Sequence, residues 1–270
     1  MKFPIGFAFN DESKKAGMEP LVQQATVPVK SLVQVYFPGR NQTLTYFNDQ
    51  LDLKRGDFVF VDGKLEGIRG VVREVNKNFK IKVADYKKVI SVADTNVSGQ
   101  MHMAGSHFIS FDTSVLPYEK IRTWYLPPVK PEDEYETGND DTVIALGKLG
   151  DIKVSQAIWE RGREYYMENH VRYICVAEGY GRAIVEGEHA YEVEFDFADG
   201  EIRNLICSCP CGYTCKHEIA AMMQMKETLE LIEKHYANLH HGYFAAIVKG
   251  ELFHFAIDSR EAGCFTLEEI

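Results

Sequence analysis

Four of the six cysteines lie in one short run, CSCPCGYTCKH, that begins at Cys207 and ends at His217. The pattern is Cys-x-Cys, then five residues, then Cys-x-His. Cys thiolate and His imidazole are the usual ligands of zinc, which binds four of them in a tetrahedron. In an extended segment, residues two apart point to the same side, so Cys207 and Cys209 can face one ion. The spacing therefore predicts one Zn²⁺ held by Cys207, Cys209, Cys215 and His217.

The residues around these ligands predict the elements that position them. Pro210 and Gly212 break the strand that carries the first two ligands and turn the chain. The apolar run that follows His217 indicates a helix, in which positions two apart diverge by about 200°. Cys215 should therefore lie just before the helix, with His217 in its first turn. Cys211 is left as a surplus thiol that could compete for the metal. The alternative is a set of buried or disulfide-bonded cysteines, but the ordered ligand spacing in an intracellular chain favours metal.

The pattern resembles the SWIM zinc finger, the family named after SWI/SNF remodelling ATPases and MuDR transposases. The resemblance includes Ala157, Gly162 and Tyr166 in a preceding helix and a hairpin at Asp199–Ile202, and it covers about residues 150 to 232. It implies a β-β-α zinc unit that binds DNA or protein and is not itself catalytic. Because such a unit has little core of its own, we expect its metal to be structural.

Composition bounds the class of protein. The chain has 270 residues, 45% hydrophobic and 26% charged, which is typical of one large globular domain or two ordinary ones. No run approaches the ~20 apolar residues of a membrane span, and the N-terminal apolar run is too short for a signal peptide. The cysteine usage suits a reducing compartment, with Cys175 and Cys264 as inert thiols. We therefore expect a cytoplasmic protein without a membrane partner.

The first part of the chain, residues 1–128, has the pattern of a small β-barrel-like domain. Short runs that alternate apolar and polar residues are separated by turn signals such as Asp62-Gly63. Closely spaced short strands of this kind favour a barrel. A short helix is expected at 117–124. The expected strands begin near Leu32 and continue at 43–47, 58–61, 68–75, 79–83, 89–92 and 107–111.

An acidic, proline-rich linker is predicted at 129–150, because prolines stiffen it and its carboxylates repel one another. The SWIM-like domain then spans 151–270. Ser155 is the expected N-cap of a helix that ends near Glu168. Strands are expected at 171–177, 182–186, 191–197 and 202–207, then the helix after His217, then a terminal hairpin of 243–248 and 251–257. The predicted fold class is α+β.

Charge is unevenly distributed along this chain of net charge −10. Residues 1–130 carry 18 Lys and Arg against 13 Asp and Glu, whereas residues 151–240 carry 9 against 16. An acidic zinc domain is a poor non-specific DNA binder, because phosphate contacts supply most of that affinity. Residues 64–88 carry eight basic and three acidic side chains. This barrel segment is the candidate DNA or RNA site, formed by Lys77, Lys80, Lys82, Lys87 and Lys88. The alternative is a solvated face whose lysines discourage edge pairing.

These observations favour a non-catalytic zinc-binding adaptor for nucleic acid or protein. The first alternative is a zinc/thiol redox sensor in which Cys211 exchanges into the metal shell. A zinc enzyme comes third, because four protein ligands leave no open position and Glu218 is the only adjacent carboxylate. The chain has no P-loop, nucleophile elbow or His-Glu-x-x-His motif.

Overall fold

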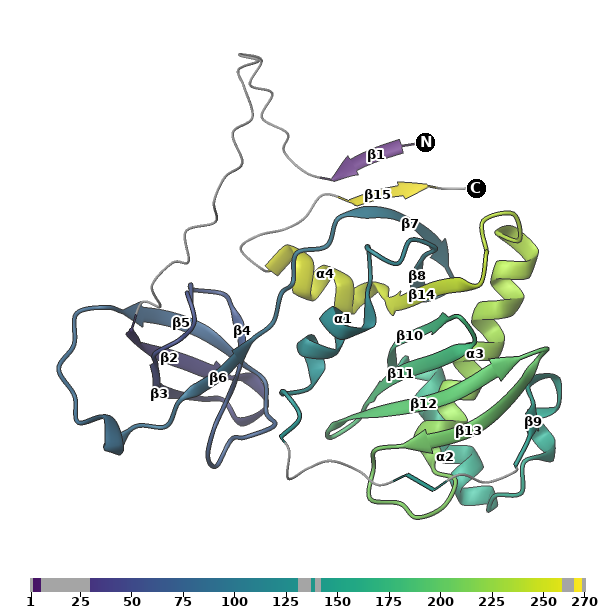
Figure 1. The fold of residues 1–270 in the computed structure, drawn as a ribbon, viewed down its shortest axis with the longest axis horizontal. Coiled ribbons are helices and arrows are strands. Elements are labelled where there is room, and N and C mark those ends of the chain that lie inside the picture. Colours follow the sequence, from purple (N-terminus) through teal and green to yellow (C-terminus); the bar gives the residue numbers. More distant parts are fainter. Residues whose placement is uncertain (1, 6–29, 131–136, 139–141, 259–264, 269–270) are drawn as a thin grey trace. The chain divides into compact units, whose positions relative to one another are not determined.

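The computed structural model of the chain describes residues 2–5, 30–130, 137–138, 142–258 and 265–268 (Figure 1). It divides into two compact units, residues 5–92 and residues 93–270, the second together with residues 1–4. Helices and two mainly antiparallel sheets confirm the α+β class. None of the helices in the described part of the chain combines the length and the apolar character needed to cross a membrane.

The smaller unit, which we call the barrel, is a five-stranded sheet with the order β3-β2-β5-β4-β6. Its first and last strands meet, since Phe47 of β3 bridges Lys88 just before β6 and its amide donates to the Lys87 carbonyl at 2.8 Å. The sheet is therefore curled on itself. Its elements are β2 (Ser31–Phe37), η1 (Pro38–Arg40), β3 (Gln42–Asn48), β4 (Phe58–Val61), β5 (Gly70–Asn76), η2 (Val83–Asp85) and β6 (Val89–Val92).

The barrel core follows from the period-2 pattern of its strands. In β2, Val33, Val35 and Phe37 are fully buried and alternate with more exposed residues. Gly70 begins β5 where a Cβ would lie 2.3 Å from the Val35 side chain, so only glycine fits this close approach.

The expected strand at 79–83 was wrong, and this segment is a loop that leads into η2. The Asn78 amide donates to the Asn76 side chain at 2.9 Å, a local turn that ends β5. Phe79 lies edge-on to Phe47, with ring centroids 6.1 Å apart, which fixes the loop by an aromatic contact. Lys80 and Lys82 therefore do not share the face of a strand.

The larger unit contains a sheet with the order β1-β15-β7-β8-β14-β10-β11-β12-β13-β9. Its strands are β1 (Lys2–Ile5), β7 (Gly99–Ala104), β8 (His107–Ser110), β9 (Ile144–Ala145), β10 (Val171–Ala177), β11 (Tyr180–Glu186), β12 (Ala190–Ala198), β13 (Glu201–Cys207), β14 (Tyr243–Val248) and β15 (Phe265–Glu268). Its helices are α1 (Tyr118–Tyr125), η4 (Leu146–Asp151), α2 (Gln156–Met167), α3 (Lys216–His235) and α4 (Lys249–Asp258).

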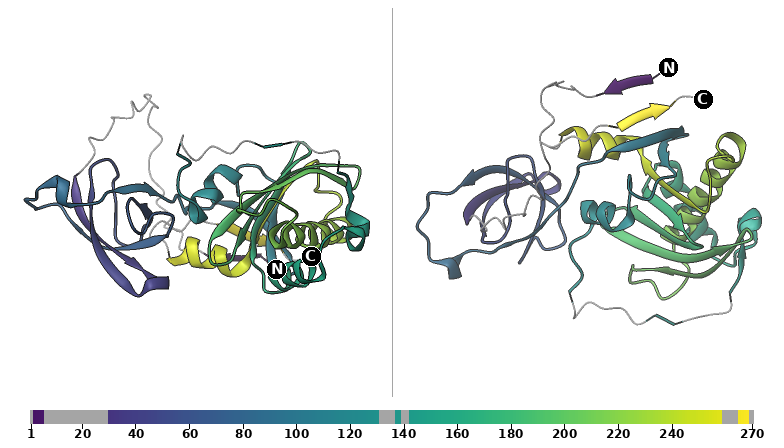
Figure 2. Two further views of the ribbon diagram at one scale, coloured as in Figure 1. Left: turned by 90° about the horizontal axis from the view of Figure 1, so that it is seen from below. Right: turned by 45° about the horizontal axis from the view of Figure 1, so that its top comes forward.

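Helices cover both faces of this sheet (Figure 2). On one face, α2 and α3 pack together and α3 lies on β10 to β13. On the other, the Tyr173 hydroxyl reaches the Leu116 carbonyl at 2.7 Å, and Trp124 of α1 stacks on Phe255 of α4. The core beneath α2 and α3 is extensive. The candidate ligands therefore belong to a unit with a large core of its own, contrary to the expectation of a small zinc unit with little core. This core includes Ile174, Ala183, Val193, Phe195, Ile202, Ala221, Met222, Met225 and Ala246.

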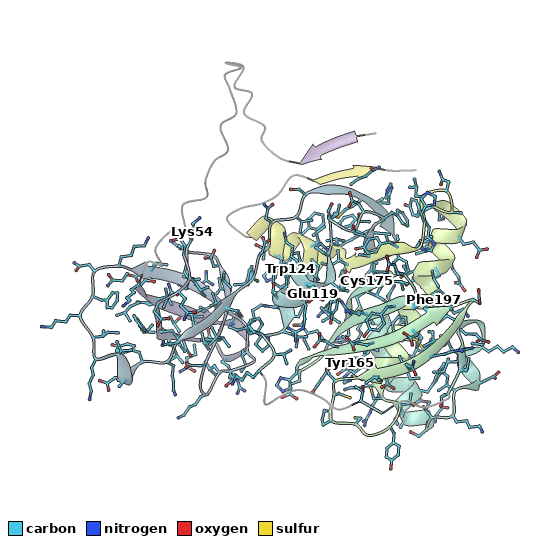
Figure 3. The ribbon with its side chains drawn as sticks, in the orientation of Figure 1. Lys54, Glu119, Trp124, Tyr165, Cys175 and Phe197 are labelled. Carbon is cyan, nitrogen blue, oxygen red and sulfur yellow. The ribbon has the colours of Figure 1, made fainter. Side chains whose placement is uncertain are left out.

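The division between the units falls between Val92 and Ala93, whereas the sequence pattern placed the boundary at 129–150. Residues 93–126 join the larger unit because β8 pairs with β14 and β7 pairs with β8. The Trp124 indole, labelled in Figure 3, is fully buried and donates to the Asp94 carbonyl at 2.7 Å.

The second half of the expected linker is packed rather than solvated. Ile144 and Ala145 of β9 pair with β13, and the Leu146 amide donates to the Gly200 carbonyl at 2.9 Å. Leu146 and Leu149 are buried in the core. The acidic residues at 131–136 and 139–141 lie outside the described residues, so a linker there stays a prediction.

The expected terminal hairpin was also wrong. Its first strand is β14, but residues 249–258 form helix α4. Leu252 and Phe255 are both fully buried, and their spacing of three residues places them on one helical face. Phe255 packs on Trp124 with ring centroids 4.7 Å apart, so tertiary packing selects the helix.

Candidate metal centre

The structure brings together the four side chains that the spacing singled out. The ligand atoms of Cys207, Cys209, Cys215 and His217 all lie within 4.8 Å of one another, and all of these residues but Cys207 are buried. The Nδ1 atom of His217 is 3.7 Å from the sulfur of Cys207 and 3.7 Å from that of Cys215. A Cys₃His cluster of this geometry could hold a metal ion.

Two arms deliver these ligands. The first arm is the end of β13, which stops at Cys207 and leads to Cys209. Ser208 between them is fixed to β12, since its amide donates to the Glu192 carbonyl and its hydroxyl accepts from the Glu192 amide, both at 2.9 Å. The second arm is the start of α3, where Cys215 is the N-cap and His217 lies in the first turn, as the sequence predicted.

A capping box organises the second arm. The Cys215 sulfur accepts from the Glu218 amide, and the Glu218 carboxylate accepts from the Cys215 amide at 3.0 Å. Cysteine thus replaces the usual Ser or Thr of this motif. Sequence reasoning missed this role, although the Cys-x-x-Glu spacing at 215–218 could have indicated it.

Aromatic rings hold the imidazole in place. The His217 ring stacks on Tyr191 of β12, with centroids 4.6 Å apart and planes at 27°. The ring of Tyr165 of α2 (labelled in Figure 3) also packs against the His217 ring, with centroids 5.6 Å apart. The Tyr165 hydroxyl accepts a hydrogen bond from Lys216 at 2.7 Å. Gly162 allows α2 to approach this closely, because a Cβ there would lie 2.6 Å from Ile219.

The cluster concentrates negative charge on one thiol. Hydrogen bonds from Cys207, His217 and the Glu218 amide lower the pKa of Cys215 to about 4. The hydrogen bond to Cys215 and burial raise the pKa of Cys207, and burial raises that of Cys209 to about 11. Burial, together with the Cys215 charge, raises the pKa of Glu218 to about 8. Ligand thiols must lose their protons to bind a metal, so protons compete with the ion.

Neither of the other two cysteines that the structure describes joins the cluster. Cys211 is exposed in the loop between the arms, and Cys175 is buried in the sheet. Cys264 lies outside the described residues.

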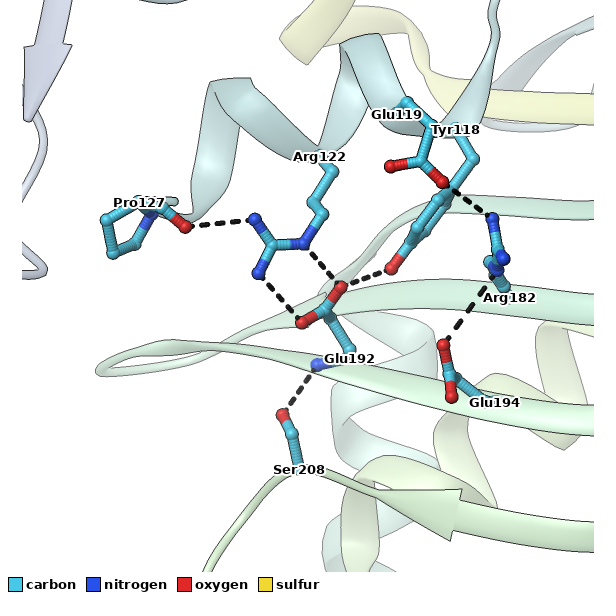
Figure 4. Close-up of polar contacts among 8 residues, drawn as sticks. All are labelled: Tyr118, Glu119, Arg122, Pro127, Arg182, Glu192, Glu194 and Ser208. Atoms are coloured by element: carbon cyan, nitrogen blue, oxygen red, sulfur yellow. Dashed lines mark hydrogen bonds and ion pairs between the residues drawn. The ribbon is translucent and has the colours of Figure 1, made fainter. Parts of the chain in front are cut away.

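An ionic network ties α1 to the first arm (Figure 4). Arg122 donates to both Glu192 carboxylate oxygens, at 2.7 and 3.1 Å, and to the Pro127 carbonyl at 2.9 Å. The Tyr118 hydroxyl donates to the same carboxylate, and burial raises the pKa of this tyrosine. Because the Glu192 backbone bonds Ser208, the network anchors the ligand arm to α1.

A groove of about 720 Å³ lies beside the metal loop. Its lining includes Arg122, Val129, Glu192, Glu194 and Tyr213 of the metal loop. Tyr213 is 90% exposed, more than any other large apolar side chain that the structure describes. The rest of the lining is Thr137, Gly138, Leu205, Ile206, Cys207, Ser208, Cys211, Gly212, Thr214 and Glu218.

The lysines of the candidate nucleic-acid site lie on one stretch of the barrel, but in different settings. Lys77, Lys80 and Lys82 are exposed on the loop before η2. The Lys87 side chain passes close to Gly63. Lys88 is held by an ion pair with Asp49 at 2.6 Å. Nucleic-acid binding by this stretch stays a prediction.

Comparison with known proteins adds no family to this picture, because no protein-family model, curated protein or solved structure matches the chain. The likeness to SWIM zinc fingers therefore rests on the motif residues, and membership of that family stays a prediction.

Proposed function

We propose that this chain is a zinc-binding, non-catalytic adaptor whose larger unit recognises a protein partner. The convergence of three cysteines and one histidine carries the proposal. Thiolate and imidazole donors together suit zinc better than the oxygen-preferring Mg²⁺ and Ca²⁺. In a tetrahedral zinc centre, Zn–S and Zn–N bonds of ordinary length separate sulfur from nitrogen by about 3.6 Å. The two 3.7 Å separations in the cluster fit that spacing.

The ligand set supports a structural metal. Four protein ligands fill a tetrahedron, whereas a catalytic zinc keeps one position for water or substrate. Glu218, the adjacent carboxylate, accepts from the Cys215 backbone amide and is only 6% exposed, so it is poorly placed to act as a general base. The likeness to the SWIM finger supports the same conclusion.

The groove beside the metal loop supports a protein partner with a basic segment. Its Leu205, Ile206 and Tyr213 offer apolar contact, and the Glu194 side chain, also in the lining, is 42% exposed. A zinc ion with three thiolates would add a net charge of about −1 next to the groove. Apolar contact together with acidic lining is the chemistry that binds a Lys- or Arg-containing peptide.

Metal content tests the first half of this proposal. The purified protein should contain one zinc per chain by elemental analysis, and Cys209→Ser should lose it. Fluorescence anisotropy tests the second half with labelled Lys/Arg-rich and Glu-rich peptides. The basic peptide should bind, and Glu194→Lys and Tyr213→Ala should weaken it while zinc content is unchanged. Equal binding of both peptides, or no effect of either variant, contradicts the proposed surface.

The basic stretch of the barrel favours a second candidate, an adaptor that also binds DNA or RNA. Lys77, Lys80 and Lys82 are exposed together on one loop. Phe79 packs on Phe47 and so is not free to stack on a base, which makes phosphate contact the expected mode. Filter binding should detect DNA or RNA binding at low salt, and the affinity should fall steeply as the salt concentration is raised. A double variant, Lys77→Glu with Lys80→Glu, should bind more weakly than wild type. Retention of binding by that variant contradicts this candidate.

A further inference from the structure

A second pocket of the larger unit is lined by residues of η4, α2 and α3. Its volume is about 540 Å³, which lies within the range of pockets that hold small ligands. Helices α2 and α3 pack together and α3 also contacts η4, so the pocket belongs to one packed part of the unit. None of the four candidate metal ligands lies in its lining. The pocket is therefore a site distinct from the metal centre.

Two aromatic rings of α2 line this pocket. Trp159 and Tyr166 are seven residues apart, which places them on one face of the helix with two turns between them. Both side chains are half-buried and pack against the core. Gly147 and Gly150 of η4 are also in the lining, and no atom lies within 4 Å of the Cβ position of either. These two positions leave the pocket open where side chains could have filled it.

Three charged side chains of α3 also line the pocket. They are Lys226, Glu227 and Glu230, which together carry a net charge of −1. Met223 precedes Lys226 by three residues, so all four lie on one face of the helix. The Lys226 ammonium lies 4.0 Å from the Glu230 carboxylate. Glu227 accepts from the Gln224 amide at 3.1 Å. The pocket thus offers aromatic faces and a negative field, but its carboxylates already have partners.

We propose that this pocket binds a trimethylated lysine side chain of a protein partner, at a site separate from the groove beside the metal loop. A quaternary ammonium is attracted to the faces of Trp and Tyr rings, and it has no N–H that needs an acceptor. Carboxylates that already have partners still supply a negative field for such a cation. An unmethylated ammonium would lose its hydrogen bonds to water and find few acceptors to replace them. Leu149 and Met223 offer apolar contact to the aliphatic stem of the lysine.

An NMR titration of the isotope-labelled full chain tests this proposal. The probe is a short Gly/Ser peptide with one lysine, either trimethylated or unmethylated. The chain has two tryptophans, so the spectrum has two indole signals, which a Trp159→Phe variant assigns. The Trp159 signal should shift with the trimethylated peptide and not with the unmethylated one. The Trp124 signal is the internal control, because that indole is buried and donates to the Asp94 carbonyl at 2.7 Å.

Variants separate the aromatic contribution from the charge. Trp159→Ala should weaken binding about 3–30-fold, the range for one cation–π contact. Glu230→Gln should weaken it about 2–5-fold, and Lys226→Gln should strengthen it by a similar factor, since it removes a positive charge from the lining. Lys234→Gln is the matched control, because Lys234 is exposed on the same helix and outside the pocket. The two charge variants decide the question if Trp159→Ala fails to fold.

Three results would overturn the proposal. They are equal shifts with both peptides, no shift of the Trp159 signal, and an affinity that Glu230→Gln and Lys226→Gln leave unchanged. Tetramethylammonium should bind more weakly than the trimethylated peptide, because it lacks the stem. Equal binding would assign the pocket to free quaternary amines and also overturn the proposal. Tyr213→Ala, which should weaken peptide binding in the groove, should leave the Trp159 shift unchanged, so the two proposals can fail separately.

Discussion

The barrel and the larger unit differ in what they bury. Among the described residues of the barrel, only Ser31 and Asn48 are buried polar side chains, and they bond each other at 3.0 Å. In the described part of the larger unit, eight polar or charged side chains are buried, and His217 and Glu218 are two of them. Burial of a polar group costs free energy unless it finds partners, so the larger unit must position its buried groups far more exactingly.

This difference indicates which kind of change should destabilise each unit most. The barrel depends on apolar packing, so steric changes should matter most there. In the larger unit, the corner that holds the ligands depends on hydrogen bonds and on the ion, while the core beneath α2 and α3 is apolar and extensive. Metal removal should therefore loosen the end of β13 and the start of α3, while the rest of the sheet persists.

The largest expected effect comes from the ligands. Cys215→Ser should abolish stoichiometric zinc binding, because it removes a thiolate ligand, whereas the serine hydroxyl can still accept from the Glu218 amide at the start of the helix. Elemental analysis after gel filtration measures the metal. Hydrogen exchange should show faster exchange at the start of α3 and unchanged exchange in the barrel. Faster exchange throughout both units would show that the ion stabilises more than its corner.

Cys211→Ser is the matched control, since Cys211 is an exposed cysteine of the same loop. It should keep one zinc per chain and lose it to peroxide as slowly as wild type does. If wild type releases zinc at low peroxide and Cys211→Ser does not, the redox-sensor alternative gains and the adaptor proposal loses its premise of a purely structural metal.

The ligand corner could be predicted from the sequence because its information is local. Four ligands, a turn and a helix start lie within one short run, and the cap at Cys215 follows from its position before an apolar helix. The partners of that corner come from elsewhere in the chain. Tyr165, Tyr191 and Arg122 are separated from it in sequence, and no spacing rule relates them to it.

A buried histidine should make the free energy of unfolding of the larger unit fall by about 3 kcal/mol in acid. His107 is 1% exposed, lies between the Ser106 hydroxyl and the Val171 carbonyl, and has a pKa lowered to about 4, chiefly by burial and also by Lys249. The unfolded chain binds the proton near pH 6.5, so this stability is complete above pH 6.5. It should be lost progressively as the pH falls toward about 4.

Thermal unfolding as a function of pH measures this effect, and His107→Gln should flatten the pH dependence between 6.5 and 5. The barrel offers an internal comparison, because residues 5–92 contain no histidine. An equal acid sensitivity of both units in this window would contradict the assignment to His107.

The secondary structure of two segments was mispredicted because their local sequence patterns were ambiguous and tertiary contacts decided the outcome. The segment 251–257 is a short, mostly apolar run that follows a Lys249-Gly250 turn signal and could form a strand, but packing of Phe255 on Trp124 makes it helical. The segment 79–83 alternates apolar and polar residues, and the turn at Asn76 ends the strand before it. The unit boundary was missed for a related reason, since β8 pairs with β14, far away in sequence.

Two glycines test the steric side of the comparison, with expected losses of about 1–3 kcal/mol each. Gly70→Ala would place a Cβ 2.3 Å from Val35 and should destabilise the barrel. Gly162→Ala would place one 2.6 Å from Ile219 and 3.0 Å from the Lys216 carbonyl, which should separate α2 from α3. Urea unfolding followed separately for each unit measures both losses.

Gly39→Ala in the barrel is the control, because no atom lies within 4 Å of its Cβ position. Gly162→Ala should also weaken zinc binding, since α2 carries Tyr165 against His217. Gly70→Ala should leave zinc binding unchanged. Weaker zinc binding in Gly70→Ala would mean that the two units are coupled.

The smallest expected effect concerns the helix cap of α2. The Ser155 hydroxyl accepts from the Ile158 amide at 3.3 Å, and replacement of such a cap by alanine typically costs about 1 kcal/mol. Ser155→Ala should therefore lower the unfolding temperature of the larger unit slightly. Gln156→Ala is the control, because it removes only the exposed contact with Glu160, worth a few tenths of a kcal/mol. Because the cap directly precedes the first residue of α2 and lies about three helical turns from Tyr165, zinc affinity should not change. A zinc affinity that falls with Ser155→Ala but not with Gln156→Ala would show that the metal corner depends on the whole of α2, and not only on the contacts of Gly162 and Tyr165.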